Sequence, residues 1–176
     1  MLSPMMTAAD LANTPIAFLF PELDGELAKT RRMLERFPDA QAAWRPHPKS
    51  RPIDALASHI ATTPFHGARL IETDELDMAT RPAPPQAATA TELLALFDQA
   101  TTALRQALPK ATGELLEQPW TLRMGPKVFF SLPRRLLLRD LVISHLVHHR
   151  AQLGIYYRLL DVPVPGSYGP SADEPW

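Results

Sequence analysis

Proline placement constrains the fold of this 176-residue chain more than any other feature of its sequence. The 19 prolines gather into clusters, and a proline inside a helix removes a hydrogen bond and clashes with the preceding turn. The stretches between the clusters carry apolar residues at helical spacing. We therefore predict four helical segments, at about residues 15–37, 52–71, 89–108 and 133–160.

Local signals predict how two of these segments begin. Ser50 is a candidate N-cap for the second segment, and Pro52 suits its first turn. Pro64 lies inside that segment, so the helix reaches residue 71 only if Pro64 bends it without ending it. Thr89 and Glu92 have the spacing of a capping box at the start of the third segment.

The stretch from Trp120 to Phe130 has β-branched and aromatic residues around a Gly-Pro pair. This pattern favours a small hairpin or an extended excursion. Strands are otherwise scarcely represented, so we predict an all-α fold, a four-helix bundle. The connections, of about ten to twenty residues, leave room for a crossover between helices. The length suits one domain, residues 1–176.

Composition argues against several classes of function. Lys plus Arg (18) nearly balances Asp plus Glu (19), so no global charge would recruit nucleic acid or an anionic membrane. The absence of cysteine excludes disulfides, thiolate metal sites and a cysteine nucleophile. The apolar patch Ile16–Phe20 lacks the flanks of a secretory signal, and no run of apolar residues would span a membrane, so we predict a cytoplasmic location. Arg134, Arg135 and Arg139 fit a solvated helix face better than a phosphate site.

Two histidines one helical turn apart interrupt the apolar face of the fourth segment. His145 and His149 project from the same face, about 6 Å apart along the helix axis. Such a pair can turn one nitrogen of each ring toward a common metal ion, or it can be a hydrogen-bonded pair in the core. His148 is an alternative partner for His145, because it is also one turn away. The predicted core-facing stripe is Leu138, Val142, His145, His149, Leu153 (or Gln152), Tyr156 and Leu160.

A third ligand would have to come from another helix. His59 is the best candidate, because it lies near the core-facing side of the second segment. His66 and His47 are predicted to be polar surface or loop residues. Three neutral imidazoles without a carboxylate or thiolate suit Zn²⁺, Ni²⁺ or Fe²⁺. They leave one coordination position open, as in catalytic zinc sites, and the missing glutamate of the H-E-x-x-H motif argues against a metalloprotease.

The sequence resembles the DinB-like (DinB/YfiT) family over nearly its whole length. The most specific parts are a His-x-x-x-His-Arg-x-Gln block in the last helical segment and a Gly-Pro-Ser-Ala-Asp-Glu ending. The matching stretches are residues 44–50, 57–60, 138–160 and 163–174.

The resemblance implies a four-helix bundle with up-down-down-up crossover topology. It also implies a metal site formed by His59, His145 and His149, holding zinc or nickel, with Fe²⁺ ranked behind them, in a chain that forms a homodimer. Characterised members of the family include S-transferases that use a low-molecular-weight thiol and a maleylpyruvate isomerase. We therefore expect a small-molecule substrate and a metal-dependent thiol S-transferase. The alternatives are a non-enzymatic metal-binding or stress-response protein and a metal-dependent small-molecule hydrolase, so whether the chain is an enzyme stays open.

Four more residues carry alternative interpretations. Arg150 and Gln152 could support substrate or metal ligands, or they could be an exposed ion-pairing arginine and an interhelical hydrogen bond. Tyr168 and Asp173 lie on the Pro/Gly-rich tail, which either closes over the site or packs against the bundle.

Overall fold

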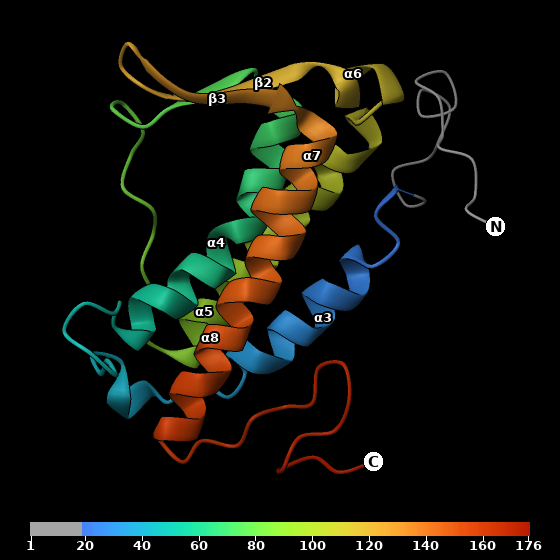
Figure 1. Ribbon diagram of the computed structural model, residues 1–176. Coiled ribbons are helices and arrows are strands. Elements are labelled where there is room, and N and C mark those ends of the chain that lie inside the picture. The colour runs from blue at the N-terminus through green and yellow to red at the C-terminus, as the bar shows by residue number, and fades with distance from the viewer. Residues whose placement is uncertain (1–18) are drawn as a thin grey trace.

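The structure is a computed structural model and describes residues 19–176. Within that range the chain is mostly helical, and its long helices pack side by side (Figure 1). η1 and η2 are single 3-10 turns, and η3 is a π-helical turn between α7 and α8. The helical elements are α3 (Leu23–Leu34), η1 (Asp39–Gln41), α4 (Ile53–Glu72), α5 (Ala90–Ala107), η2 (Leu108–Lys110), α6 (Gly113–Glu117), α7 (Arg134–Leu138), η3 (Arg139–Ser144) and α8 (His145–Leu159).

The four predicted helical segments correspond to α3, α4, α5 and the continuous run from α7 through η3 to α8. The part of the first segment at residues 15–18 lies outside the described residues, as does most of the apolar patch Ile16–Phe20. α4 packs against α3, α5 and α8, so it contributes to the core on several sides. The order of helix directions in an up-down-down-up bundle stays a prediction here.

The N-caps of α4 and α5 were both predicted from the sequence. Thr89 caps α5 as predicted, because its side chain accepts a hydrogen bond from the backbone N–H of Glu92 at 3.2 Å. The prediction of Ser50 as the N-cap of α4 was wrong. The capping position is Pro52, whose side chain makes no capping hydrogen bond, and α4 begins at Ile53.

Pro64 is buried inside α4 without ending it. A proline has no N–H to donate to the preceding turn. Hydroxyl groups beside it supply local hydrogen bonds: Thr63 donates to the carbonyl of His59 at 2.8 Å, and Thr62 donates to the carbonyl of Ser58 at 2.9 Å. α4 continues past Pro64 to Glu72, as the sequence predicted for a proline that only bends the helix.

The core-facing stripe of the last helix differs from the prediction after Val142. The π-helical turn η3 shifts the following residues, because each turn of a π-helix takes in one more residue than an α-turn. His145 and His149 are consequently half-buried beside the core and not central to it. The buried residues beyond η3 are Leu146, Arg150, Leu153 and Tyr157.

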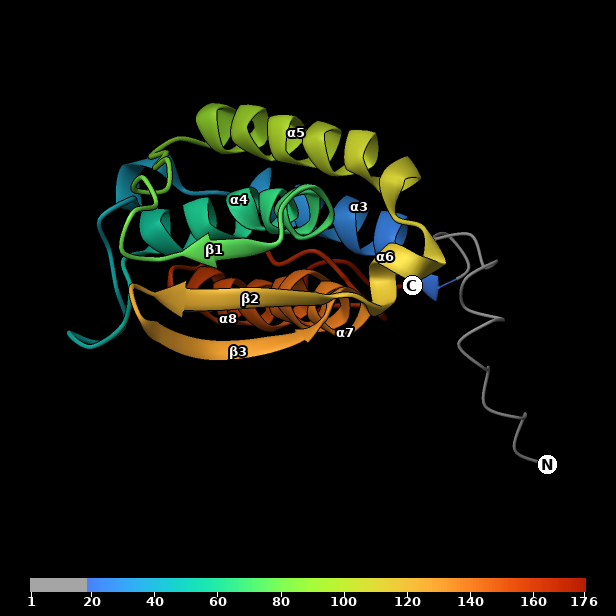
Figure 2. The ribbon, with the colours of Figure 1, turned by 90° about the horizontal axis from the view of Figure 1, so that it is seen from above.

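A small three-stranded sheet lies across one end of the helices (Figure 2), so the all-α prediction was incomplete. β2 (Pro119–Met124) and β3 (Lys127–Pro133) are antiparallel, and Gly125 has a positive φ of 54° in the turn that joins them. This hairpin confirms one of the two alternatives predicted for residues 120–130. The short strand β1 (Glu75–Asp77), which follows α4, pairs in parallel with β2.

The arginine cluster of the sequence serves the fold. Arg134 is only 1% exposed, and it donates to the carbonyls of Leu70 and Thr73, so the prediction of a solvated face was wrong at this position. Arg135 pairs with Glu117, and Arg139 pairs with Glu22, just before α3. With these partners the three arginines do not form a phosphate site. Within residues 19–176 no helix is long and apolar enough to cross a membrane.

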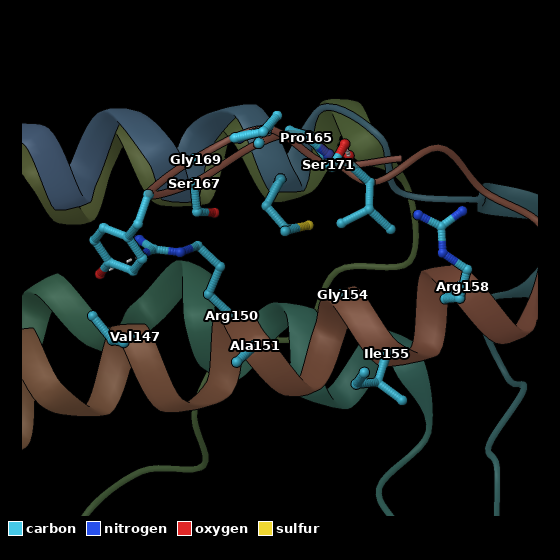
Figure 3. Close-up of a pocket in the computed structure, with 15 residues that line it drawn as sticks. Val147, Arg150, Ala151, Gly154, Ile155, Arg158, Pro165, Ser167, Gly169 and Ser171 are labelled. Atoms are coloured by element: carbon cyan, nitrogen blue, oxygen red, sulfur yellow. Dashed lines mark hydrogen bonds between the residues drawn. The ribbon is translucent and has the colours of Figure 1, made fainter. Parts of the chain in front are cut away.

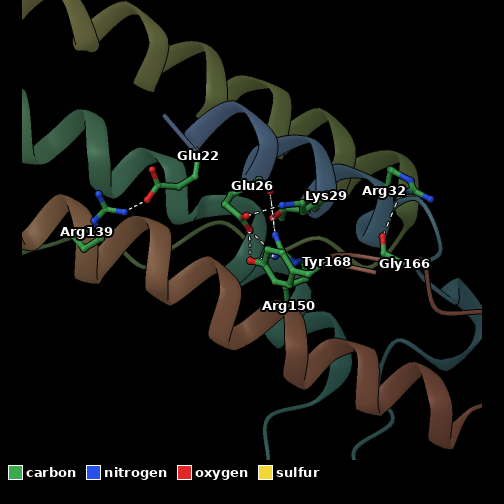
Figure 4. Close-up of polar contacts among 9 residues, drawn as sticks. Glu22, Glu26, Lys29, Arg32, Arg139, Arg150, Gly166 and Tyr168 are labelled. Atoms are coloured by element: carbon green, nitrogen blue, oxygen red, sulfur yellow. Dashed lines mark hydrogen bonds and ion pairs between the residues drawn. The ribbon is translucent and has the colours of Figure 1, made fainter. Parts of the chain in front are cut away.

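The C-terminal tail packs against α3 and α8, as one of the two predicted alternatives required. The Tyr168 hydroxyl donates to Glu26 at 2.7 Å and accepts from Arg150 at 2.9 Å (Figure 4). Farther along, Asp173 pairs with Arg158 at 2.6 Å. Arg150 is thus a buried ion-pairing residue, where the sequence had suggested an exposed one.

Candidate metal centre

Three histidines from two helices meet beside the core. His59 lies on α4, and His145 and His149 lie on the first turns of α8. One ring nitrogen of each lies within 4.8 Å of the others, so these nitrogens could hold a metal ion. The ring centroids are 4.9 Å apart for His59 and His145, 4.7 Å for His59 and His149, and 4.4 Å for the pair on α8. The structure therefore brings together the three residues predicted from the sequence.

The packing of α4 against α8 and η3 sets this arrangement. The Nε2 atoms of His59 and His145 face each other at 2.7 Å. Nitrogen ligands around a tetrahedral zinc ion lie about 3.3 Å apart, as follows from Zn–N bonds of about 2.0–2.1 Å. A small outward movement of the rings would open the pair to that separation, while the backbone could stay where the core holds it.

A hydrogen bond orients the third imidazole. The side-chain oxygen of Gln152 lies 2.7 Å from Nδ1 of His149. An amide oxygen only accepts, so Nδ1 carries the proton and the lone pair of Nε2 is free to bind a metal. Gln152 is therefore the residue that supports a candidate ligand, and the bond lies within α8 and not between helices.

The electrostatics of the cluster keep its imidazoles neutral. Burial lowers the pKa of His59 to about 3, with a further contribution from the charges of His145 and His149. Burial and the neighbouring His149 lower the pKa of His145 to about 4. Burial also lowers the pKa of His149, and the hydrogen bond that His149 donates to Gln152 partly opposes this shift. Neutral imidazole is the form that binds metal ions, so these side chains are ready to do so near pH 7.

The other histidines take no part in this group of nitrogens. His148 is exposed, and the converging set includes His149 in its place. His47 lies in a loop, where its Nδ1 accepts from the backbone N–H of Lys49 at 3.1 Å. His66 is half-buried, with its ring centroid 6.3 Å from that of His59, so the prediction of a surface position was only partly right.

A cavity of about 180 Å³ opens beside the histidines. Residues from α4, the sheet and η3 form its walls, together with the two clustered histidines His59 and His145. These wall residues were not predictable from the sequence, because they meet only when β1 pairs with β2. The lining consists of His59, His66, Arg69, Leu70, Leu76, Met78, Arg81, Trp120, Leu122, Leu141 and His145.

A second, larger cavity of about 430 Å³ lies between α8 and the C-terminal tail (Figure 3). Its walls include Arg150, Gly154 and Tyr168, but none of the three clustered histidines. The tail residues Tyr168 and Asp173 therefore pack on another face of α8 and do not close over the cluster.

Comparison with known proteins identifies the family. The family model of the DinB superfamily matches residues 22–153. A DinB-like protein from Bacillus cereus ATCC 10987 has a similar structure, with a TM-score of 0.66 and 22% identity over 87% of this chain and 97% of that one. A DinB-like protein from Bacillus subtilis gives a TM-score of 0.64 and 19% identity over 83% and 96%. No curated protein matches the sequence. The chain belongs to the DinB superfamily.

Proposed function

We propose that this protein binds a divalent metal, Zn²⁺ or Ni²⁺, through His59, His145 and His149, and that it is a metal-dependent transferase that uses a low-molecular-weight thiol. The observation that carries the proposal is the convergence of three neutral imidazoles beside a cavity. Among residues 19–176, the converging group contains three ligand atoms and no fourth. Three protein ligands with an open position are typical of catalytic metal sites, whereas structural sites are closed by a fourth.

The chemistry of the donors fits the proposed metals. Imidazole nitrogen suits Zn²⁺ and Ni²⁺, whereas Mg²⁺ and Ca²⁺ prefer oxygen ligands. Gln152 holds His149 in the tautomer that presents Nε2. Burial keeps His59 and His145 unprotonated well below neutral pH. A metal ion would therefore not have to displace protons from these ligands at pH 7.

The charges around the site favour an anionic nucleophile. The positive charge of Arg51 acts on all three histidines and helps to lower their pKa values. No carboxylate lines the cavity in the described part of the chain. A divalent metal in this setting would lower the pKa of a thiol and generate a thiolate at neutral pH. The protein has no cysteine of its own, so the thiol would come from a cosubstrate.

The same cavity argues for transfer over hydrolysis. Beyond what a metal ion supplies, hydrolysis is helped by a general base that takes a proton from the attacking water. The described lining offers no Asp or Glu, and His66, its only histidine outside the cluster, has a pKa lowered to about 4, chiefly by burial. Such an imidazole is a weak base. A thiol is already far more acidic than water and depends less on a base.

We also propose that the chain is one domain, that its helices form the up-down-down-up bundle, and that it is a homodimer. The long connection between α4 and α5 runs back along the molecule (Figure 1), which supports a crossover. Val128 and Phe129 are exposed on the edge strand β3 at 55% and 45%, which supports a partner surface there. Light scattering over a dilution series tests the dimer.

Metal analysis of purified variants tests the site. We expect about one metal ion per chain in the wild type, and loss of metal in both His59→Ala and His149→Ala. His148→Ala is the matched control, because His148 is exposed on the same turn of α8 and lies outside the converging group. Full metal content in both of the first two variants would rule out the three-histidine site.

A thermal-shift panel of low-molecular-weight thiols, with and without added Zn²⁺ or Ni²⁺, tests the transferase. Stabilisation by a thiol should require metal and should disappear in His149→Ala. If every thiol fails to stabilise the metal-loaded protein, the transferase proposal is wrong and a non-enzymatic metal-binding role takes its place.

A further inference from the structure

The cavity beside the histidines has almost entirely apolar walls, and the side chains of two arginines contribute to its lining. Leu76 and Met78 come from β1 and the turn after it, and Trp120, from β2, is 3% exposed. Arg69 of α4 and Arg81 of the following connection also line the cavity, and both are half-buried. A space with such walls would take an apolar body, and its cations would select a negative charge on that body.

Neither of these arginines forms an ion pair with a carboxylate among residues 19–176, where the nearby acidic residues pair with other cations. Nearby guanidinium groups differ: Arg123 pairs with Glu75 at 2.6 Å, and Arg134 pairs with Asp74 at 2.5 Å. The acidic residues at this end of the molecule thus pair with other cations, and the charges of Arg69 and Arg81 remain beside the cavity.

The electrostatic effect of the two arginines reaches into the cavity. Burial is the main reason that the pKa of His66 falls to about 4, and the charges of Arg69 and Arg81 lower it further. His66 lines the same cavity as His59 and His145. The arginines therefore lie close enough to act on a ligand there, and the low-dielectric walls would strengthen the interaction with an anion.

We propose that this cavity binds a small organic carboxylate with an apolar body, and that Arg69 and Arg81 hold its carboxylate. Its volume of about 180 Å³ is below the range of about 300–1,000 Å³ found for drug-sized ligands, so the ligand is of the size of benzoate or hexanoate. Guanidinium groups suit carboxylates because they can donate two parallel hydrogen bonds. The inference rests on the proposed function in one respect: the ligand would lie beside the histidine site, where its carboxylate group would hold it in place and would not itself react.

Calorimetric titration with two matched pairs of probes tests the proposal. Benzoate and hexanoate are compared with the neutral amides benzamide and hexanamide, on metal-free and on metal-loaded protein. Arg69→Gln and Arg81→Gln remove one cation each. Arg105→Gln is the control, because Arg105 lies on α5 and pairs with Asp24 outside the cavity. The indole N–H signal of Trp120, identified by Trp120→Phe, reports by NMR whether the probe enters this cavity.

At least one carboxylate should bind more tightly than its amide and shift the Trp120 signal. Arg69→Gln and Arg81→Gln should each weaken its binding by about tenfold or more, whereas Arg105→Gln should not. Equal binding of carboxylate and amide, an unchanged affinity in both variants, or no binding at all would overturn the proposal. The proposal would also be overturned if carboxylate binding required metal and had the same affinity in Arg69→Gln and Arg81→Gln, because the anion would then be a metal ligand. Metal content of the same variants is measured in parallel, so loss of the carboxylate site is distinguished from loss of the metal site.

Discussion

Replacing Glu26 with Gln should destabilise the fold strongly, because Arg150 would stay charged and buried without its partner. Arg150 is 2% exposed and Glu26 is 3% exposed. The guanidinium lies 2.6 Å from the Glu26 carboxylate (Figure 4). It also donates to the Thr30 hydroxyl at 3.1 Å. Breaking one side of a buried ion pair costs about 3–5 kcal/mol. For a chain of this length that corresponds to a fall in Tm of about 6–20 °C.

Companion variants separate the ion pair from other effects of substitution. Arg150→Met should cost about 2–3 kcal/mol, because Glu26 keeps hydrogen bonds from Lys29 at 2.8 Å and Tyr168 at 2.7 Å. The double variant should cost less than the sum of the two single variants. Arg158→Met is the control on the same helix: Arg158 is 49% exposed in its pair with Asp173, so its loss should cost no more than about 1 kcal/mol.

Urea unfolding followed by circular dichroism measures these differences at pH 7 and at acidic pH. Burial raises the pKa of Glu26, but hydrogen bonds from Lys29, Arg150 and Tyr168 outweigh it and hold the pKa below its usual value of 4.5. The resulting stabilisation is present above pH 4.5 and is lost as the pH falls below it, and Glu26→Gln should lack this loss. A Glu26→Gln variant that is no less stable than Arg158→Met would contradict this prediction, and so would single changes at Glu26 and Arg150 whose effects simply add.

Three further predictions concern the cluster and the core. In the unfolded chain a histidine takes up a proton near pH 6.5, whereas folded His59 stays neutral down to about pH 3, its pKa in the fold. The free energy of unfolding of the metal-free protein should therefore fall by up to about 2 kcal/mol for this residue between pH 7 and pH 5. Urea unfolding of His59→Phe should show a smaller fall. Gly67→Ala should destabilise the fold by about 1–3 kcal/mol, because the new Cβ would lie 2.7 Å from Leu104. At Gly154 a Cβ would make only ordinary contacts. Gly154→Ala should therefore stabilise α8 by up to about 1 kcal/mol in thermal unfolding. Gln152→Ala should weaken metal binding by about 10–100-fold in a competition titration, because it frees the imidazole that Gln152 orients.

The helices of this fold were predictable because their boundaries depend on local chemistry. Prolines are unfavourable at most helix positions. Accordingly, α5 begins at Ala90, after one proline cluster, and α7 begins at Arg134, directly after another. The capping box at Thr89 acts within four residues and needs no partner from elsewhere. The cap of α4 was mispredicted because Ser50 instead takes part in a turn, where its N–H donates to the carbonyl of His47 at 2.8 Å.

Features that depend on distant partners were not predictable. β1 is three residues long and exists because it pairs with β2, more than forty residues later in the chain. Arg150 is charged, and only its contact with Glu26, 124 residues away, makes its burial favourable. The cavity beside the histidines depends on both kinds of contact, since its walls come from the sheet and from two helices.

The candidate site and the buried ion pair depend on the same rotation of α8. His145 directly precedes Leu146, and His149 directly precedes Arg150, so each histidine is one residue away from a side chain that the core holds in place. Successive residues of a helix are rotated by about 100°, which turns the histidines from the face toward α3 to the face toward α4. Because η3 adds a residue to the turn before them, a strictly α-helical segment would bury the histidines and expose Arg150, as the sequence pattern alone suggested. The π-turn therefore directs both imidazoles toward α4, where His145 lines the cavity, while the ion pair to α3 fixes the rotation of α8.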